Sequence, residues 1–236
     1  MHDTTPQFQA LYESMLTFVN TCMSGHDPSH NPAHVHRVVA LANIILDAER
    51  ALHPNTDYDG AVVKLAALLH DIGDRKYLHT LTAEGENETL EPTTMVRHAL
   101  VKHGAPVNLA SKVQTVVSHV SYSTETKNPS AIRQLIDNER LIELAIVQDA
   151  DRLDAIGAIG IGRTFTFLGA QGTKFLVDGK WEMNNSIEHF GEKLELLEGM
   201  MKTETGRKMA QERTERLRIF RGWWEEEMEL ISASRV

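Results

Sequence analysis

The stretch Ala61-Val-Val-Lys-Leu-Ala-Ala-Leu-Leu-His-Asp-Ile-Gly-Asp74 places an imidazole and a carboxylate side by side at the end of an apolar helical run. Adjacent residues on a helix point about 100° apart, so they seldom aim at one point in mid-helix. At a helix end, with Gly73 there to let the backbone turn, both side chains can converge on one ion. His70 and Asp71 therefore indicate half of a metal site.

The bulk composition is that of a soluble protein with one sizeable core. The chain has 236 residues, of which 42% are hydrophobic and 24% charged, and this fits a single domain. No apolar stretch approaches the ~18 residues of a membrane span, and the N-terminus lacks the basic start and apolar centre of a signal peptide. Cys22 is the single cysteine, which excludes an internal disulfide. We therefore expect a cytoplasmic protein.

The net charge of −9 argues against a nucleic-acid polymer as the main partner, because such binding depends on clustered Lys and Arg. It does not exclude an anionic small molecule, since a bound divalent cation can dominate the local field. The sequence predicts no membrane partner, and a homodimer is compatible with it.

Apolar residues recur at helical spacing along almost the whole chain, and Asn31-Pro32 is a typical helix start. Further helices are expected at 89–103, 109–120, 138–154, 186–202 and 205–231. The expected loops are 24–30, 53–59, 76–88, 121–129 and 169–185, with a short hairpin or an ordered loop at 174–181. This pattern predicts one all-α domain, a helical bundle. We expect the last two helices to fold back on it, burying Phe220, Trp223, Trp224, Met228 and Ile231.

Two more polar side chains stand at helix positions that could complete the metal site. His34 falls in the first turn of the helix that Asn31-Pro32 opens, and Asp149-Ala-Asp-Arg-Leu-Asp154 closes another apolar helical run. Asp149 and Asp151 lie about 200° apart on a helix, so only one of them can be a ligand. Ligands from three helices meet only in the fold, so these wide spacings alone do not establish a site.

Three motifs in order carry a family resemblance: His34-Val-His-Arg-Val38, Leu68-Leu-His-Asp-Ile-Gly-Asp74 and Gln148-Asp-Ala-Asp-Arg-Leu-Asp154. The series resembles the HD superfamily of metal-dependent phosphohydrolases, whose signature is His…His-Asp…Asp on a bundle of helices. The stretches 155–163 and 189–194 are similar to small stand-alone members. The resemblance covers 24–227 and implies one HD domain over 1–236, with an HD core near 24–155 and C-terminal helices near 186–231 packing back on it.

Carried over residue by residue, the resemblance implies four metal ligands, which are His34, His70, Asp71 and Asp151. The family pattern Ala-Asp-Arg-Leu selects Asp151 over its neighbour two residues earlier. Asp154 shares a helical face with Asp151, so we expect it to orient a ligand or a water.

Two imidazoles and two carboxylates form a mixed nitrogen and oxygen set. Such a set suits one divalent transition metal, Mn²⁺, Fe²⁺, Co²⁺, Ni²⁺ or Zn²⁺, whereas Mg²⁺ prefers oxygen ligands alone. Four protein ligands leave positions for a water and a phosphate oxygen, as hydrolysis requires. The resemblance thus implies cleavage of a phosphate ester of a small metabolite, a nucleotide or a phosphate monoester. The alternatives are a structural metal or a His-Asp pair satisfied within the core.

Other polar residues are candidates for acid–base chemistry or substrate binding. Asp74 matches a position that is acidic and catalytic in some relatives and lysine in others; it could act as general base or acid, or be a plain turn carboxylate. Arg37, one turn from His34, is expected to hold phosphate oxygens, with Arg152 and Lys76 as weaker candidates. All three are otherwise surface or helix-stabilising charges.

His119 is expected to contact substrate rather than to bind a second metal or lie in the core. A second metal would also need His98 or His103, whose spacing fits poorly. His189 and Lys193 share one helical face and could offer cations to phosphate, although a packed histidine and a surface lysine are the simpler interpretation.

Two histidines near the expected site have little helical context. His26-Asp27 precedes Pro28 in a turn, and His30 lies outside the helix that Pro32 opens, so we predict no ligand role for either. Two other functions stay open. One is a dinuclear-iron oxygenase of the kind some relatives have become, and the other is a metal-binding regulatory protein without turnover.

Overall fold

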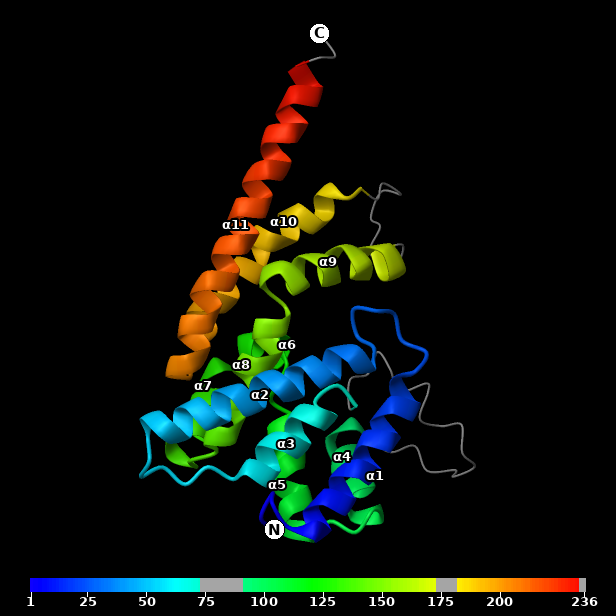
Figure 1. Ribbon diagram of the computed structural model, residues 1–236, viewed down its shortest axis with the longest axis vertical. Coiled ribbons are helices and arrows are strands. Elements are labelled where there is room, and N and C mark those ends of the chain that lie inside the picture. Colours follow the sequence, from blue (N-terminus) through cyan, green and yellow to red (C-terminus); the bar gives the residue numbers. More distant parts are fainter. Residues whose placement is uncertain (73–90, 173–181, 234–236) are drawn as a thin grey trace.

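The computed structural model describes residues 1–72, 91–172 and 182–233. The regular elements in those ranges are helices, which confirms the predicted all-α class (Figure 1). Within them, no helix is both long enough and apolar enough to cross a membrane. Asp74, Lys76 and the stretch expected as a hairpin, 174–181, lie outside the described residues.

Helix α3, Gly60–Leu69, is the centre of the lower body of the molecule. All its residues except Lys64 are buried, and it packs against α1, Pro6–Met23, α2, Pro32–Leu52, and α8, Ile142–Asp154. A helix that is apolar on every side is expected in such a central position. The end of α3, where His70 follows, is therefore held on several sides.

Local capping sets where the helices of this body begin. The Asn31 side chain accepts from the backbone N–H of Ala33 at 3.0 Å, and Pro32 opens α2, as the sequence predicts. The Asp59 side chain accepts from Val62 N–H at 3.2 Å and starts α3. Because α2 begins at residue 32, His34 falls in its first turn.

The middle of the chain contains more helix than the sequence analysis expects. Helices α4, Pro92–Lys102, and α5, Val107–Val117, are followed by α6, Tyr122–Lys127, and α7, Pro129–Arg133. The expected loop at 121–129 was therefore wrong. The Ser121 and Asn128 side chains cap these two short helices, accepting from Thr124 N–H and Ala131 N–H. A π-helix, Gln134–Asn138, precedes α8, so α8 begins four residues later than predicted.

An upper layer is formed by α9, Gly157–Gln171, α10, Asn184–Glu192, and α11, Glu204–Ala233 (Figure 1). The helix expected at 186–202 is divided at Lys193, after which Leu194–Met200 forms a 3₁₀-helix. The tight turn from α8 into α9 requires glycine, since Gly157 has φ +72° and a Cβ on Gly160 would overlap the carbonyl of Ala155.

The end of α11 does not pack as the sequence analysis expects. Phe220 and Trp224 contact Phe165 of α9, with ring centroids 6.1 and 5.7 Å away. Trp223, Met228 and Ile231 are 61%, 45% and 48% exposed, so their predicted burial was wrong. Figure 1 shows why: the last turns of α11 extend past the other described helices.

Candidate metal centre

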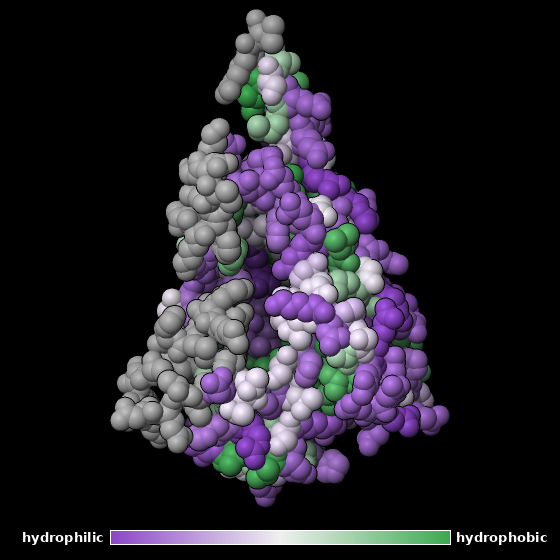
Figure 2. Space-filling model, turned by 180° about the vertical axis from the view of Figure 1, so that it is seen from behind, coloured by the Kyte–Doolittle hydropathy of each residue, from purple (hydrophilic) through white to green (hydrophobic). Residues whose placement is uncertain are grey.

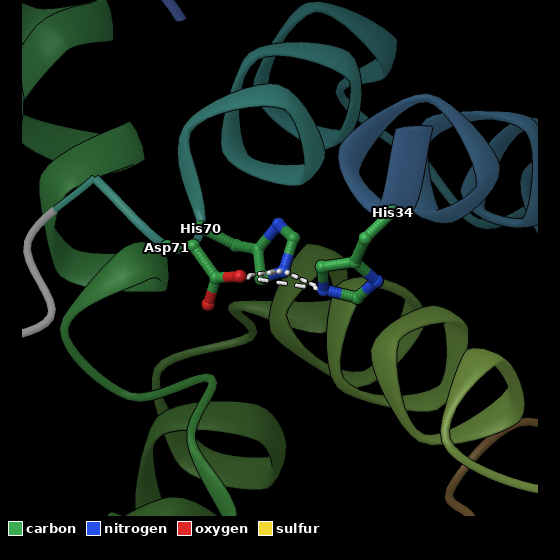
Figure 3. Close-up of side chains that lie close together, drawn as sticks. All are labelled: His34, His70 and Asp71. Carbon is green, nitrogen blue, oxygen red and sulfur yellow. Dashed lines mark hydrogen bonds and ion pairs between the residues drawn. The ribbon is translucent and has the colours of Figure 1, made fainter. Parts of the chain in front are cut away.

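Three elements bring their polar ends to one point beneath α9. His34 comes from the first turn of α2, His70 is the C-terminal cap of α3, and Asp71 follows it (Figure 3). Asp151 comes from the last turn of α8. The structure thus brings together the four side chains that the family resemblance implies as ligands.

The geometry of this cluster is compact. Nε2 of His34 lies 3.1 Å from Nε2 of His70, and Oδ2 of Asp71 is 3.3 and 3.4 Å from these two nitrogens. Potential ligand atoms of these three residues all lie within 4.8 Å of one another. Oδ1 of Asp151 is 3.7 and 3.8 Å from the two nitrogens, and its side chain is 28% exposed. Solvent therefore reaches the cluster on the Asp151 side.

Hydrogen bonds on the far side of each imidazole determine which nitrogen carries the proton. Nδ1 of His34 is 2.7 Å from a carboxylate oxygen of Asp154, and Nδ1 of His70 is 2.8 Å from the carbonyl of Ala67. Both partners only accept hydrogen bonds, so each Nδ1 is the donor. In the neutral rings both Nε2 lone pairs then point into the cluster, as metal-ligating histidines require.

The charges of the cluster also fit a cation. Oδ2 of Asp71 is buried and makes no hydrogen bond with any described residue. Burial lowers the pKa of His70, but Asp71 and Asp151 outweigh this and raise it to about 9. Burial likewise opposes ionisation of Asp71, yet the two imidazoles hold its pKa well below the usual value. Two carboxylates facing two lone pairs therefore need a positive charge between them, from a proton or from a metal ion.

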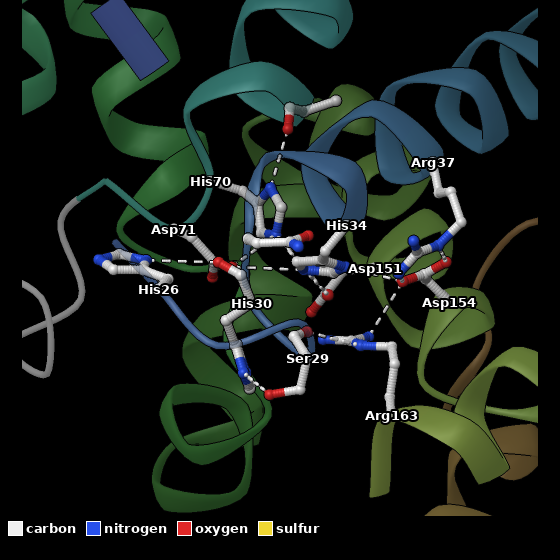
Figure 4. A network of polar contacts seen from close by, with 12 residues as sticks. His26, Ser29, His30, His34, Arg37, His70, Asp71, Asp151, Asp154 and Arg163 are labelled. Atoms are coloured by element: carbon white, nitrogen blue, oxygen red, sulfur yellow. Dashed lines mark hydrogen bonds and ion pairs between the residues drawn. The ribbon is translucent and has the colours of Figure 1, made fainter. Parts of the chain in front are cut away.

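Asp154 connects His34 to two arginines (Figure 4). Arg37 donates to both of its oxygens, at 2.7 and 3.0 Å, and Arg163 of α9 lies 3.1 Å away. Burial raises the pKa of Asp154, but the bonds from His34 and Arg37 and the charge of Arg163 hold it far below the usual value. Asp154 is thus a permanent carboxylate that fixes the ring of His34. Arg37 contacts Asp154, and the role of Arg37 toward phosphate stays a prediction.

Asp149 faces the opposite side of α8 from the cluster, as the helical angle predicts. It is fully buried and accepts from the backbone N–H of Lys202 at 3.0 Å and from N–H and Oγ1 of Thr203 at 2.7 Å. Burial raises the pKa of its carboxyl group despite these bonds. Asp149 therefore holds the start of α11 on the body.

The loop before α2 contributes neighbours that sequence reasoning missed. The ring of His30 packs edge-on against His34, with centroids 5.9 Å apart, and against Phe167 of α9. Burial lowers its pKa to about 4, so the ring is neutral at pH 7. Ser29 supplies the carbonyl that accepts from Arg163 Nε at 2.8 Å. The signal available was Asp27, whose side chain caps the turn by accepting from Ser29 N–H.

Other predicted residues lie in varied settings. Nδ1 of the half-buried His119 bonds to the carbonyl of Thr115 at 2.7 Å, and the side chain of Gln148 in α8 donates to the backbone carbonyl of His119. The ammonium group of Lys193 lies 4.9 Å from the centroid of the Tyr122 ring.

Two of the weaker candidates are occupied by structural contacts. Arg152 is buried against Glu125 and the carbonyl of Met200, so it ties α8 to the C-terminal segment. His103 bonds to Ser14 of α1 at 2.7 Å, and so does not supply a second imidazole to the cluster.

The comparisons with known proteins place the chain in a family. The HD domain model matches residues 33–156, more than half of the chain and all four clustered residues. The chain belongs to the HD-domain family. A curated relative, the uncharacterized protein YpgQ of Bacillus subtilis, is 34% identical over 201 residues, covering 85% of each chain.

Solved structures of the family share the whole architecture. The crystal structure of Bacillus subtilis YpgQ in complex with ADP is 30% identical, covers 94% of this chain and 96% of its own, and has a TM-score of 0.67. An HD-superfamily hydrolase from Bacillus thuringiensis is 26% identical, covers 94% and 98%, and has a TM-score of 0.63. The chain therefore has the HD-superfamily hydrolase fold, with a His/Asp cluster suited to a divalent metal.

Proposed function

We propose that this HD-domain protein is a metal-dependent phosphohydrolase that cleaves a phosphate ester of a small metabolite, a nucleotide or a phosphate monoester. The observation that carries the proposal is the convergence of two Nε2 lone pairs and two carboxylates at a point open to solvent on the Asp151 side. His34, His70, Asp71 and Asp151 would hold one divalent ion. When bound, that ion polarises a phosphoryl oxygen and lowers the pKa of a water.

The negative charge of the site indicates that an anionic substrate would bind after the metal ion. Asp71 and Asp151 repel an anion, whereas a divalent cation between them reverses the local potential. Asp154 keeps the proton on Nδ1 of His34, so its Nε2 stays available throughout. That YpgQ, a relative of the same architecture, was crystallised in complex with ADP supports a nucleotide as the substrate class.

The remaining residues have proposed roles toward the substrate. His119 and Lys193 would contact it, and Arg37 would neutralise a phosphate oxygen from its 34% exposed side chain while holding Asp154. Asp74 would act as general acid or base, and it lies outside the described residues. None of these roles is needed for metal binding, which allows binding and turnover to be tested separately.

Metal stripping and reloading tests the proposal. Purified protein is stripped, reloaded with Mn²⁺, Fe²⁺, Co²⁺, Ni²⁺, Zn²⁺ or Mg²⁺, and assayed for hydrolysis of a panel of nucleotides and sugar phosphates. We expect turnover that depends on a transition metal and is lost in His70→Ala. The matched control is His36→Ala, because His36 is exposed on α2, two residues from His34.

Failure would take one of two forms. Metal-loaded protein that binds ADP but hydrolyses no member of the panel would favour a regulatory protein. Two irons per chain with metal-dependent oxygen consumption would favour the oxygenase alternative.

A further inference from the structure

One face of helix α9 fastens the loop before α2. Arg163, Phe167 and Gln171 recur every four residues, so their side chains lie within about 80° of one another around the helix axis. Nε of Arg163 donates to the carbonyl of Ser29 at 2.8 Å, and Gln171 donates to the side chain of Asp27 at 3.1 Å. The ring of Phe167 contacts the same loop. The position of this loop therefore depends on α9.

Arg163 also reaches the carboxylate that orients a predicted metal ligand. Its Nη1 lies 3.1 Å from Oδ2 of Asp154, the oxygen that is 2.7 Å from Nδ1 of His34 (Figure 4). The side chains of Arg163 and Asp154 are 13% and 2% exposed, so little water screens this pair. Arg163 spans from the upper layer to the lower body, which a hydrophilic recess separates on one face (Figure 2).

The ring of His34 has a second support that also leads to Arg163. His30 packs edge-on against His34, with ring centroids 5.9 Å apart. The hydroxyl of Ser29 lies 2.7 Å from Nδ1 of His30, and the carbonyl of Ser29 accepts from Arg163. Ser29 is buried, so its carbonyl depends on a partner within the chain. Arg163 thus supports His34 both at Nδ1 and at the side of the ring.

A second arginine, Arg37, contacts Asp154 in a different way. It extends from α2, the helix that carries His34, and its side chain is 34% exposed. Arg37 therefore ties the helix of His34 to Asp154. Arg163 comes from another helix and joins Asp154, the loop before α2 and α9 through one guanidinium group. Arg37 alone cannot hold the loop in place.

We propose that Arg163 is a positioning residue of the metal centre, which holds the imidazole of His34 in ligand geometry through Asp154 and Ser29. It acts on the ion through these groups. The affinity of the site for a divalent cation then depends on α9, although none of the four proposed ligands comes from α9. This inference rests on the metal site of the proposed function, and not on the reaction catalysed there.

Titration of the metal-free chain with Mn²⁺ tests this role, with free Mn²⁺ followed by electron paramagnetic resonance. Arg163→Gln should raise the dissociation constant for Mn²⁺ about 10–100-fold, the loss typical of residues that orient a ligand. Arg163→Lys should bind equally weakly, because an ammonium group keeps the charge but cannot bond Asp154 and Ser29 with one planar fork. Full affinity in Arg163→Lys would mean that charge alone matters, and would overturn the proposal.

The matched control is Arg213→Gln. Arg213 of α11 donates to the carbonyl of Leu153, so it binds the same end of α8 through the backbone. We expect both glutamine variants to lower Tm in EDTA, and only Arg163→Gln to weaken Mn²⁺ binding. Equal loss of Mn²⁺ affinity in the two variants, or unchanged affinity in Arg163→Gln, overturns the proposal.

Two-bond ¹H–¹⁵N spectra of the metal-free chain give a readout that needs no ion. The signals of His34 are identified by their loss in His34→Asn. In the wild type Nδ1 should carry the proton, and in Arg163→Gln the tautomer protonated at Nε2 should become populated. An unchanged tautomer overturns the proposal. A wild-type chain that binds no metal would refute the proposed function instead, and the tautomer would still decide this inference.

Discussion

The same substitution made at two positions of α8 should have opposite consequences. Asp149→Asn and Asp151→Asn both replace one carboxylate oxygen with an amide, two residues apart on one helix. Asp149 is fully buried and holds Lys202 and Thr203, whereas Asp151 is 28% exposed and faces the imidazoles of His34 and His70. We expect the first change to reduce stability and the second to remove the metal.

The magnitude for Asp149→Asn follows from its hydrogen bonds. Its Oδ2 accepts from N–H and Oγ1 of Thr203, and both oxygens lie 3.0 Å from Lys202 N. An asparagine oxygen in the Oδ2 position keeps the Thr203 bonds and its share of the Lys202 bond, but the NH₂ group in the Oδ1 position then faces the same Lys202 N–H, donor against donor. Disrupting this shared hydrogen bond costs about 1–3 kcal/mol. The raised pKa of Asp149 shows that burying its charge is unfavourable, so relief of that charge places the net cost in the lower part of this range.

For a chain of this length, about 1–2 kcal/mol lowers Tm by roughly 2–8 °C. Asp151→Asn should leave the free energy of unfolding in EDTA within about 1 kcal/mol of wild type, because a partly exposed side chain is changed. It should, however, abolish turnover and lower metal affinity more than the 100-fold typical of residues behind the ligands. Differential scanning calorimetry in EDTA and elemental analysis after dialysis measure the two effects. Metal loss in Asp149→Asn with retention in Asp151→Asn would refute the reasoning.

Three further outcomes are expected. His70→Ala or Asp71→Ala should remove metal and hydrolysis together while circular dichroism shows an unchanged helical content; wild-type metal content in either variant would mean that the site is elsewhere. His119→Ala should weaken substrate turnover about 10–100-fold with about one metal per chain retained, and elemental analysis falling from two metals to one would instead support a dinuclear centre. Glu125→Gln should destabilise the fold by about 3 kcal/mol at pH 7, because buried Arg152 loses its carboxylate. Burial raises the pKa of Glu125, but the bonds from Arg152 and Lys202 lower it below its unfolded value of 4.5, so this stabilisation is present above about pH 4.5 and is lost as the pH falls further. Thermal unfolding of the variant and the wild type should therefore converge in acid.

Local chemistry explains which parts of the fold were predictable from the sequence. Asn31-Pro32 caps and opens α2 through atoms within two residues, so the place of His34 in the first turn followed directly. The opposite orientation of Asp149 and Asp151 is likewise a property of one helix. The short helices α6 and α7 were missed because their caps, Ser121 and Asn128, are residues equally typical of loops.

The surroundings of the ligands depend on residues far apart in the chain. Asp154 contacts His34, 120 positions away, and Arg163 reaches the carbonyl of Ser29 across 134 positions. The spacing of residues within one helix cannot predict such contacts, because they form only when distant helices, and α9 with the loop before α2, pack together in the fold. His30 was set aside for the same reason, since its position outside the helix is correct but its ring still packs on His34.

The end of α11 shows a different limit of sequence reasoning. Phe220, Trp224, Met228 and Ile231 recur on one face, and the pattern alone predicts that this face is buried. Burial also requires a body beside every turn, and a helix of 30 residues is about 45 Å long. The body ends near Trp224, so the same apolar periodicity that packs against α9 continues into solvent.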